Sequence, residues 1–279
     1  MFNLSFIKMK KKEIGLIFII LLIVSIGFIA SNSFGTKTIL LKFSLNKGDS
    51  ITKNISIFSK DGGEIKLAVK GIKQGVILNK NNFVLDKGEK KQVKILFNSS
   101  SINEGVYVGN IEITSNREKE IIPIIFEVES KDIFFDANLD IPARYLDIFQ
   151  GDKIIAQLNV FDLISGGGTQ ESLKPSSIKV EYNIYDLYGN ILSSENENFI
   201  INNKIQMTKT ITFPKDIKTG QYVFSAVIKY KSSVGTTTEL FRISKKESKS
   251  LIDLFKKNDS GFLFILIFIG FIFLILIIL

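Results

Sequence analysis

The chain has 279 residues and carries a net charge of +8, with 36 lysines and arginines against 28 aspartates and glutamates, and it contains no histidine and no cysteine. Without these two residue types the chain lacks the commonest general base, the thiolate nucleophile and the usual zinc ligands, which excludes most hydrolase templates and leads us to expect no catalytic, cofactor or metal site. The basic residues are spread along the chain rather than gathered beside aromatic ones, so nucleic acid is not an expected partner.

Residues 1–33 have the layout of a membrane-targeting segment. Four lysines within residues 8–12 precede an apolar run over residues 14–30, which is typical of a cleaved signal peptide or of a retained signal anchor. Small residues suited to cleavage follow at Ala30 and Ser31. The run is long for a signal peptide and short for a membrane span, so both alternatives stay open.

Residues 37–244 alternate apolar and polar side chains over short runs separated by turn residues, which is typical of β-strands. The clearest alternating runs are Ile65, Leu67 and Val69; Val93, Ile95 and Phe97; Ile124, Phe126 and Val128; Ile154, Ala156, Leu158 and Val160; Ile178, Val180, Tyr182 and Ile184; and Tyr222, Phe224, Ala226 and Ile228. We expect each strand to have one dry and one wet face, with two sheets packed on their dry faces. The predicted fold class is all-β, with two tandem immunoglobulin-like β-sandwiches between an N-terminal signal or anchor helix and a C-terminal transmembrane helix.

A recurring turn phrase divides this region into similar halves, residues 37–130 and 131–244. The phrase is a glycine followed by an acidic residue, directly before a strand. It occurs at Gly48 in the first half and at Gly151 in the second, and Gly88 repeats it inside the first half. The halves are therefore interpreted as duplicated β-modules.

A second phrase, Gly-x-Tyr at the start of a late strand, occurs once in each half. It places Gly105 before Tyr107 and Gly220 before Tyr222. In immunoglobulin-like sandwiches a tyrosine at this place forms a corner, with its hydroxyl bonded to nearby backbone. The alternative is an ordinary inward-facing aromatic residue, which implies the same fold.

The residues around these turns resemble a known group of domains. The sequences NKGDS at residues 46–50, FVLDKGE at 83–89 and GVYVGNI at 105–111 are similar to the immunoglobulin-like domains associated with α-galactosidases, which are widespread in archaeal membrane-anchored surface proteins. The resemblance implies a sandwich fold, a surface location and a supporting or adhesive role. It implies no catalytic residue.

Three aspartates, Asp132, Asp136 and Asp140, recur at a spacing of four near the junction of the halves. Carboxylates can hold a cation, but a calcium loop has denser oxygen ligands than these, so we favour a solvated linker and leave metal binding open. Three sequons place candidate glycosylation sites at Asn54, Asn98 and Asn258.

A glycine-rich stretch over residues 166–177 lacks the lysine and hydroxyl that follow the glycines of a phosphate loop. It is interpreted as a surface loop and as a candidate for partner contacts.

Residues 245–260 form a basic juxtamembrane linker, and residues 261–279 are a predicted transmembrane helix made only of Gly, Phe, Leu and Ile. The lysines before the first apolar run keep the amino terminus cytoplasmic, which sends residues 34–260 to the extracytoplasmic side of the cell membrane. The lysines of the linker conflict with this orientation. They contact anionic lipid headgroups, contact an acidic surface polymer or form a solvated stalk, and the last is favoured.

Two functions remain open. The first is a non-enzymatic, membrane-anchored cell-surface protein whose tandem domains have a structural or protein-interaction role, with membrane lipid and other surface or membrane proteins as partners. The second is a carbohydrate-binding or accessory subunit of a membrane enzyme complex, with glycans as partners. Aromatic residues outside the strict alternation are the candidates for sugar contact: Tyr145, Phe149, Tyr185 and Tyr188.

Overall fold

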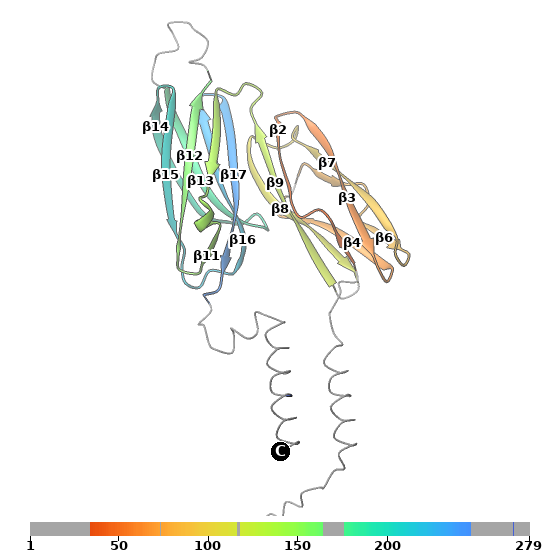
Figure 1. The fold of residues 1–279 in the computed structure, drawn as a ribbon. Helices are drawn as coiled ribbons and strands as arrows, with labels where there is room; N and C mark the ends of the chain where they lie inside the picture. Colours follow the sequence, from red (N-terminus) through yellow and green to blue (C-terminus); the bar gives the residue numbers. More distant parts are fainter. Residues whose placement is uncertain (1–33, 73, 116–117, 164–175, 247–269, 271–279) are drawn as a thin grey trace, which may run out of the picture.

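The computed structural model describes residues 34–72, 74–115, 118–163, 176–246 and 270. Apart from Gly270 and one 3₁₀ turn, η1 (Ala143–Tyr145), the regular elements described are β-strands, and they build two β-sandwiches that lie side by side (Figure 1). The all-β prediction is therefore confirmed. The predicted membrane segments, residues 1–33 and 261–279, lie outside the described residues except for Gly270, and the described residues include no helix with the length and apolar character needed to cross a bilayer.

The first sandwich packs a four-stranded sheet on a five-stranded sheet. The four-stranded sheet has the order β1 (Phe34–Thr36), β3 (Ser50–Ser59), β7 (Lys90–Asn98), β5 (Val76–Leu78). The five-stranded sheet has the order β2 (Leu41–Asn46), β9 (Glu118–Glu129), β8 (Gly105–Ser115), β4 (Gly63–Lys70), β6 (Asn82–Leu85). Alternate residues of both sheets, such as Ile55, Phe97 and Ile111, point inward and form one buried apolar cluster.

The second sandwich has the same plan. Its smaller sheet has the order β10 (Phe135–Asp140), β12 (Lys153–Asp162), β15 (Lys204–Thr212). Its larger sheet has the order β11 (Asp147–Phe149), β17 (Ser233–Ser244), β16 (Gly220–Tyr230), β13 (Ser176–Asp186), β14 (Ile191–Ile201). In each sandwich a short strand runs parallel to the last strand, β2 beside β9 and β11 beside β17, while the other strand pairs are antiparallel. This shared strand order supports the interpretation of the halves as duplicated modules.

The glycine-acid phrase forms the same turn three times. In each copy the amide of the acidic residue donates to the carbonyl three residues earlier, Asp49 to Asn46, Glu89 to Asp86 and Asp152 to Phe149, at 3.0 Å each. Gly48, Gly88 and Gly151 hold the third position of these turns with positive φ, which a type II turn requires. Two of the acids, Glu89 and Asp152, also accept a hydrogen bond from the amide that opens the turn. Glycine thus supplies the backbone geometry and the acid closes the turn.

The Gly-x-Tyr phrase opens β8 and β16, where Gly105 and Gly220 again have positive φ. The Tyr107 hydroxyl donates to the Asn103 carbonyl at 2.9 Å, and the Tyr222 hydroxyl donates to the Lys218 carbonyl. Each tyrosine thus reaches the backbone four residues before it. In each sandwich this hydrogen bond fixes the loop that leads into the strand, β8 in the first and β16 in the second.

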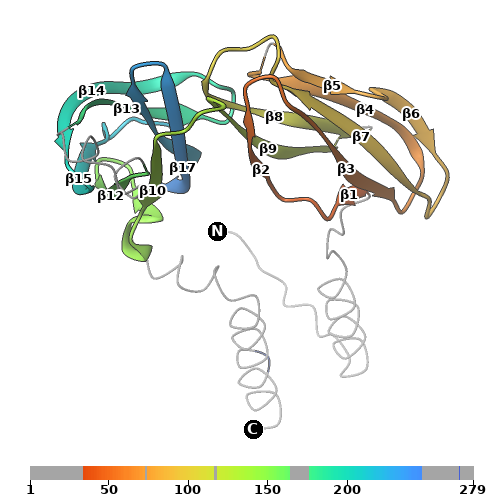
Figure 2. The ribbon, with the colours of Figure 1, turned by 90° about the horizontal axis from the view of Figure 1, so that it is seen from above.

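The expectation of one dry and one wet face for each strand is wrong for β9 and β16, strands of the two larger sheets, although β2 and β4 alternate as predicted. Residues 122–128 of β9 and 222–228 of β16 are buried without alternation. Both faces of these strands are covered, because the outer face of each larger sheet packs against the other sandwich. Figure 2 shows the two sandwiches side by side, and the residues between them form one buried apolar cluster.

Tyr107→Phe and Tyr222→Phe each remove one hydroxyl bond while keeping the ring. We expect each substitution to lower the free energy of unfolding by about 1 kcal/mol, measured by urea denaturation. Tyr188→Phe, on a ring that is 46% exposed, is the control and should leave the stability nearly unchanged. Equal stability of the Tyr107→Phe and native proteins would contradict the role given to the corner bonds.

Candidate functional site

The junction of the two sandwiches is the most extensively built feature outside the two cores. Its buried apolar residues come from both sides: Val106, Val108 and Ile125 of the first sandwich and Tyr185, Val223 and Val227 of the second, with Leu40, Leu187, Val234 and Leu240 packed around them. Burying a side chain of this kind contributes about 1.5–3 kcal/mol. Domains within one chain usually move relative to each other unless their interface is large and apolar, so we infer that these two form one rigid unit.

The turn between β13 and β14 inserts into the first sandwich. The Asn110 side-chain amide donates to the Leu187 carbonyl at 2.7 Å, and Asn110 is fully buried. A Cβ atom added at Gly71 would lie 2.6 Å from the Tyr188 carbonyl oxygen, and one added at Gly189 would lie 2.6 Å from the Val108 carbonyl oxygen. Glycine is therefore needed on both sides of this contact, because the two backbones approach too closely for any side chain.

Local hydrogen bonds within the turn hold its shape. The Asp186 carboxylate accepts from the backbone amides of Tyr188 and Asn190, at 2.8 and 2.9 Å, and also from the Asn190 side chain. This is the Asx pattern that stabilises tight turns. We call this turn, residues 186–190, the wedge.

Acidic residues of β9 meet threonines of β17 across the same junction. The Thr238 hydroxyl donates to the Glu127 carboxyl, and both the amide and the hydroxyl of Thr236 donate to Glu129, at 2.9 and 3.2 Å. Glu127 is only 8% exposed, and burial raises the pKa of its carboxyl, although the bond from Thr238 and the nearby charge of Lys42 oppose the rise. The Lys42 ammonium itself donates to the Thr238 carbonyl. Polar groups inside the junction thus fix the register of the two sheets.

The opposite flank of the second sandwich ends in two long edge strands, β14 and β15, which are the outermost strands of their sheets (Figure 1). The ammonium of Lys209 on β15 lies between the sheets, 2.5 Å from the Glu195 carboxylate and bonded to that of Glu197, both on β14. Burial acts to lower the pKa of Lys209, but the bonds to these two carboxylates outweigh it and raise that pKa. These ion pairs bridge the two sheets of the second sandwich at this flank.

A pocket of about 360 Å³ lies at one end of the first sandwich, lined by Gly71, Gln74, Ser101, Ile102, Asn103 and Tyr107. The lining offers amide and hydroxyl groups. These groups suit hydrogen bonding to a neutral ligand, and the lining residues that the structure describes do not pair a nucleophile with a base.

The three aspartates do not form a cation site in this arrangement. Asp136 and Asp140 lie four residues apart on β10, a distance of about 13 Å along a strand, and Asp132 precedes that strand. All three are exposed, and the described residues contain no cluster of acidic side chains that could hold a metal ion.

The candidate glycosylation sites have different surroundings. Asn54 is exposed on β3, whereas the side chain of Asn98, at the end of β7, accepts from the Ser100 amide. Asn258 lies outside the described residues, as does most of the loop at 166–177, of which residues 176 and 177 begin β13.

The four aromatic candidates for glycan contact are not brought together. Tyr185 is buried in the junction, and Tyr188 is exposed on the wedge. Tyr145 packs against the core of the second sandwich, and Phe149 is exposed at the end of β11. The prediction that Tyr185 contributes to a surface for sugars is therefore not supported by its position.

The junction was missed at the sequence level, although a signal for it exists. The run IIPIIFEV over residues 121–128 is too continuously apolar for a strand with one wet face, and Val223 and Val227 interrupt the expected polar face of β16. Such runs are typical of strands that are covered on both faces.

No protein-family model matches the chain, and no curated protein matches it. Among solved structures the chain is similar to a protein of unknown function from Porphyromonas gingivalis W83, with 10% identity over 76% of this chain and 98% of that chain and a TM-score of 0.41. It is also similar to the PapD-like domain 7 of human CEP192, with 11% identity over 47% of this chain and 99% of that chain and a TM-score of 0.31. A third similar structure is the periplasmic chaperone SfaE, with 9% identity over 75% of this chain and 98% of that chain and a TM-score of 0.31. Similarities of this size carry no inference about activity or partners.

Gly189→Ala tests the wedge, and Gly88→Ala is its matched control. Both glycines have positive φ, 80° and 75°, so each substitution costs about 1–2 kcal/mol of backbone strain. Only Gly189→Ala adds a clash across the junction, because a Cβ at Gly88 meets nothing within 4 Å. We expect urea denaturation to show a larger loss of stability for Gly189→Ala, together with faster proteolysis between the sandwiches. Equal losses for the two variants would contradict the close backbone contact.

Glu127→Gln tests the buried carboxyl. Because the folded-state pKa of Glu127 is raised, the folded protein favours the neutral form of this carboxyl. The free energy of unfolding therefore falls as pH rises from the ordinary carboxyl pKa through the raised value. We expect Glu127→Gln to be more stable than the native protein at neutral pH, with the difference shrinking as pH falls toward 4. Glu239→Gln, at the exposed rim of the junction, is the control. Thermal denaturation at several pH values measures the effect, and a difference that does not depend on pH would contradict it.

Proposed function

We propose that this chain is a non-enzymatic, membrane-anchored cell-surface protein whose two sandwiches act as one rigid ectodomain for binding another protein. The observation that carries the proposal is the buried junction, which fixes the two modules in one arrangement. A rigid pair can hold a binding surface at a defined distance and angle, which a flexible tandem cannot do.

The placement of the chain ends supports membrane anchoring. The described chain begins at β1 and ends after β17, and both lie at the same end of the molecule, the lower end in Figure 1. In the sequence the apolar run at residues 14–30 precedes β1, and the apolar run at residues 261–279 follows β17. Two membrane segments joined to the same end are compatible with one bilayer. By the positive-inside rule, the lysines of residues 8–12 favour a cytoplasmic amino terminus. The two sandwiches, which follow the first apolar run, then form an extracytoplasmic ectodomain.

The outer edge of β14 supports a protein partner. This strand is 11 residues long and outermost in its sheet, and it lies on the flank away from the first sandwich. An extended segment of another chain can bind such an edge through main-chain hydrogen bonds. The ion pairs of Lys209 with Glu195 and Glu197 keep the sandwich closed behind the edge while the edge itself faces outward.

The turn phrases that the two halves share also lead us to propose kinship with the immunoglobulin-like domains of archaeal surface proteins and α-galactosidases. A glycan-binding or accessory role is the less favoured candidate, because its aromatic residues lie at separate places in the fold.

Photo-crosslinking in native membranes tests the proposal. A photoreactive residue replaces Asn196 on β14 or, as the control, Thr52 on the exposed face of β3. We expect the full chain to sediment with membranes and to trap a protein from position 196 but not from position 52. Recovery of the chain in the soluble fraction would contradict anchoring, and equal capture from both positions would contradict the role of β14.

A further inference from the structure

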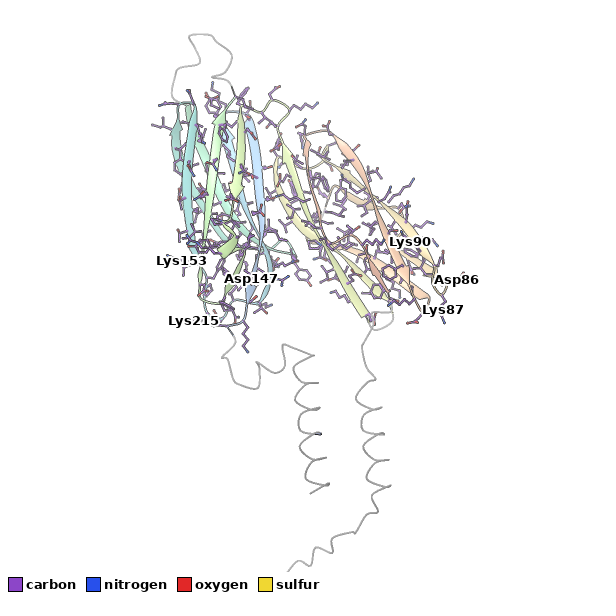
Figure 3. The ribbon with its side chains drawn as sticks, in the orientation of Figure 1. Asp86, Lys87, Lys90, Asp147, Lys153 and Lys215 are labelled. Atoms are coloured by element: carbon purple, nitrogen blue, oxygen red, sulfur yellow. The ribbon has the colours of Figure 1, made fainter. Side chains whose placement is uncertain are left out.

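The lower end of the second sandwich combines positive charge with exposed apolar side chains. We define the basic tip as residues 143–153, 213–219, 245 and 246. Its six basic residues are all exposed: Arg144, Lys153, Lys215, Lys218, Lys245 and Lys246. Against them stand three acidic residues, Asp147, Asp152 and Asp216, which leaves an excess of three positive charges. Figure 3 shows Asp147, Lys153 and Lys215 together at this end.

Backbone hydrogen bonds hold the parts of the basic tip together. The Gln150 amide donates to the Ser244 carbonyl at 3.1 Å, and the Phe213 amide donates to the Asp152 carbonyl at 3.0 Å. The Gln150 side chain also donates to the Ile217 carbonyl. The three segments are therefore fixed as one surface.

Two of the three acids are engaged within the basic tip. The Asp147 carboxylate accepts from the Ser244 hydroxyl at 2.7 Å, and the Asp152 carboxylate accepts from the Phe149 amide at 3.2 Å. By contrast, none of the six basic residues forms an ion pair with another described residue. The positive charge is thus presented outward.

Two apolar residues of the basic tip are exposed. Phe149 is 43% exposed and Leu146 is 37% exposed. The Arg144 guanidinium stacks over the neighbouring Tyr145 ring, 4.7 Å from its centroid. Aromatic and aliphatic side chains set among basic residues are typical of a surface that enters the headgroup region of an anionic membrane.

The same end of the first sandwich differs in charge. Two of its turns, at residues 60–62 and 86–90, carry three basic residues, Lys60, Lys87 and Lys90, against three acidic ones, Asp61, Asp86 and Glu89. These two turns together carry no net charge, whereas the basic tip carries an excess of three positive charges.

We propose that the basic tip docks on anionic lipid headgroups, with Phe149 and Leu146 inserted among them. This inference rests on the proposed membrane anchoring, which places this end of the molecule toward the bilayer. Fourteen residues, 247–260, separate the basic tip from the apolar run at 261, and they could span about 45 Å if extended. Docking is therefore not imposed by the length of the linker. It depends on the attraction between the basic tip and the lipid.

Single-cysteine labelling tests the docking, because the chain contains no cysteine of its own. The full chain is reconstituted into phosphatidylcholine nanodiscs with and without phosphatidylglycerol. An environment-sensitive fluorophore is attached through Thr219→Cys, in the basic tip, or through Asn203→Cys, at the opposite end of the second sandwich. Quenching by a nitroxide carried on the lipid headgroup is measured for each label.

We expect quenching at position 219 to be several-fold stronger than at position 203, and to require phosphatidylglycerol. Lys153→Glu combined with Lys215→Glu should abolish the difference, as should Phe149→Ser combined with Leu146→Ser. The matched controls are Lys87→Glu with Lys90→Glu in a turn of the first sandwich and Leu163→Ser with Ile200→Ser at the opposite end of the second sandwich, where these two residues are 54% and 70% exposed. These controls should leave quenching unchanged.

The outcomes separate the inference from the proposed function. If the chain enters nanodiscs but positions 219 and 203 are quenched equally, the docking is overturned and the anchoring stands. Quenching at 219 that needs no anionic lipid, or that survives both sets of substitutions in the basic tip, also overturns the docking. Failure of the native chain to enter nanodiscs at all overturns the anchoring on which the inference rests.

Discussion

The contact between the two larger sheets is the constraint on which the rest of the molecule depends. In an ordinary sandwich the outer face of each sheet is wet, but here the outer faces of β8 and β9 cover those of β13, β16 and β17. Tandem modules joined by a linker would sample many orientations. This junction buries apolar residues from both modules, and Asn110 binds the wedge through a hydrogen bond. Only one relative orientation of the two modules keeps the apolar contact and the hydrogen bond together.

The duplicated plan explains how the two modules come to have different surfaces. Both use the same type II turns and the same tyrosine corners, so the framework is set by a few glycines, acids and tyrosines. The remaining surface is then free to differ. The second module has the wedge at one place, the long edge of β14 at another and a positively charged end at a third, whereas the turns at residues 60–62 and 86–90 of the first module carry balanced charges.

Local features of the fold were predictable from the sequence, and long-range contacts were not. Alternation over residues such as Val93, Ile95 and Phe97 predicts strands because the side-chain period of a strand is two, and the glycine-acid phrase predicts its turns because a positive φ favours glycine. The junction was not predicted because it depends on which outer sheet faces pack against each other. Alternation within one strand carries no information about contacts between sheets of different sandwiches. The burial of Tyr185 and Glu127 follows only from this tertiary contact. The continuous apolar run at residues 121–128 and the valines at 223 and 227 were its local traces in the sequence.

The central claim is that the two sandwiches form one rigid unit, and distances between them test it most directly. With no native cysteine, spin labels can be attached through Thr52→Cys on the first sandwich and Asn198→Cys on the second, and the distance between them measured by double electron–electron resonance on the full chain. If the two sandwiches form one rigid unit, we expect one narrow distance distribution, which denaturant broadens only when the sandwiches themselves unfold. A broad or multiple distribution under native conditions would contradict it.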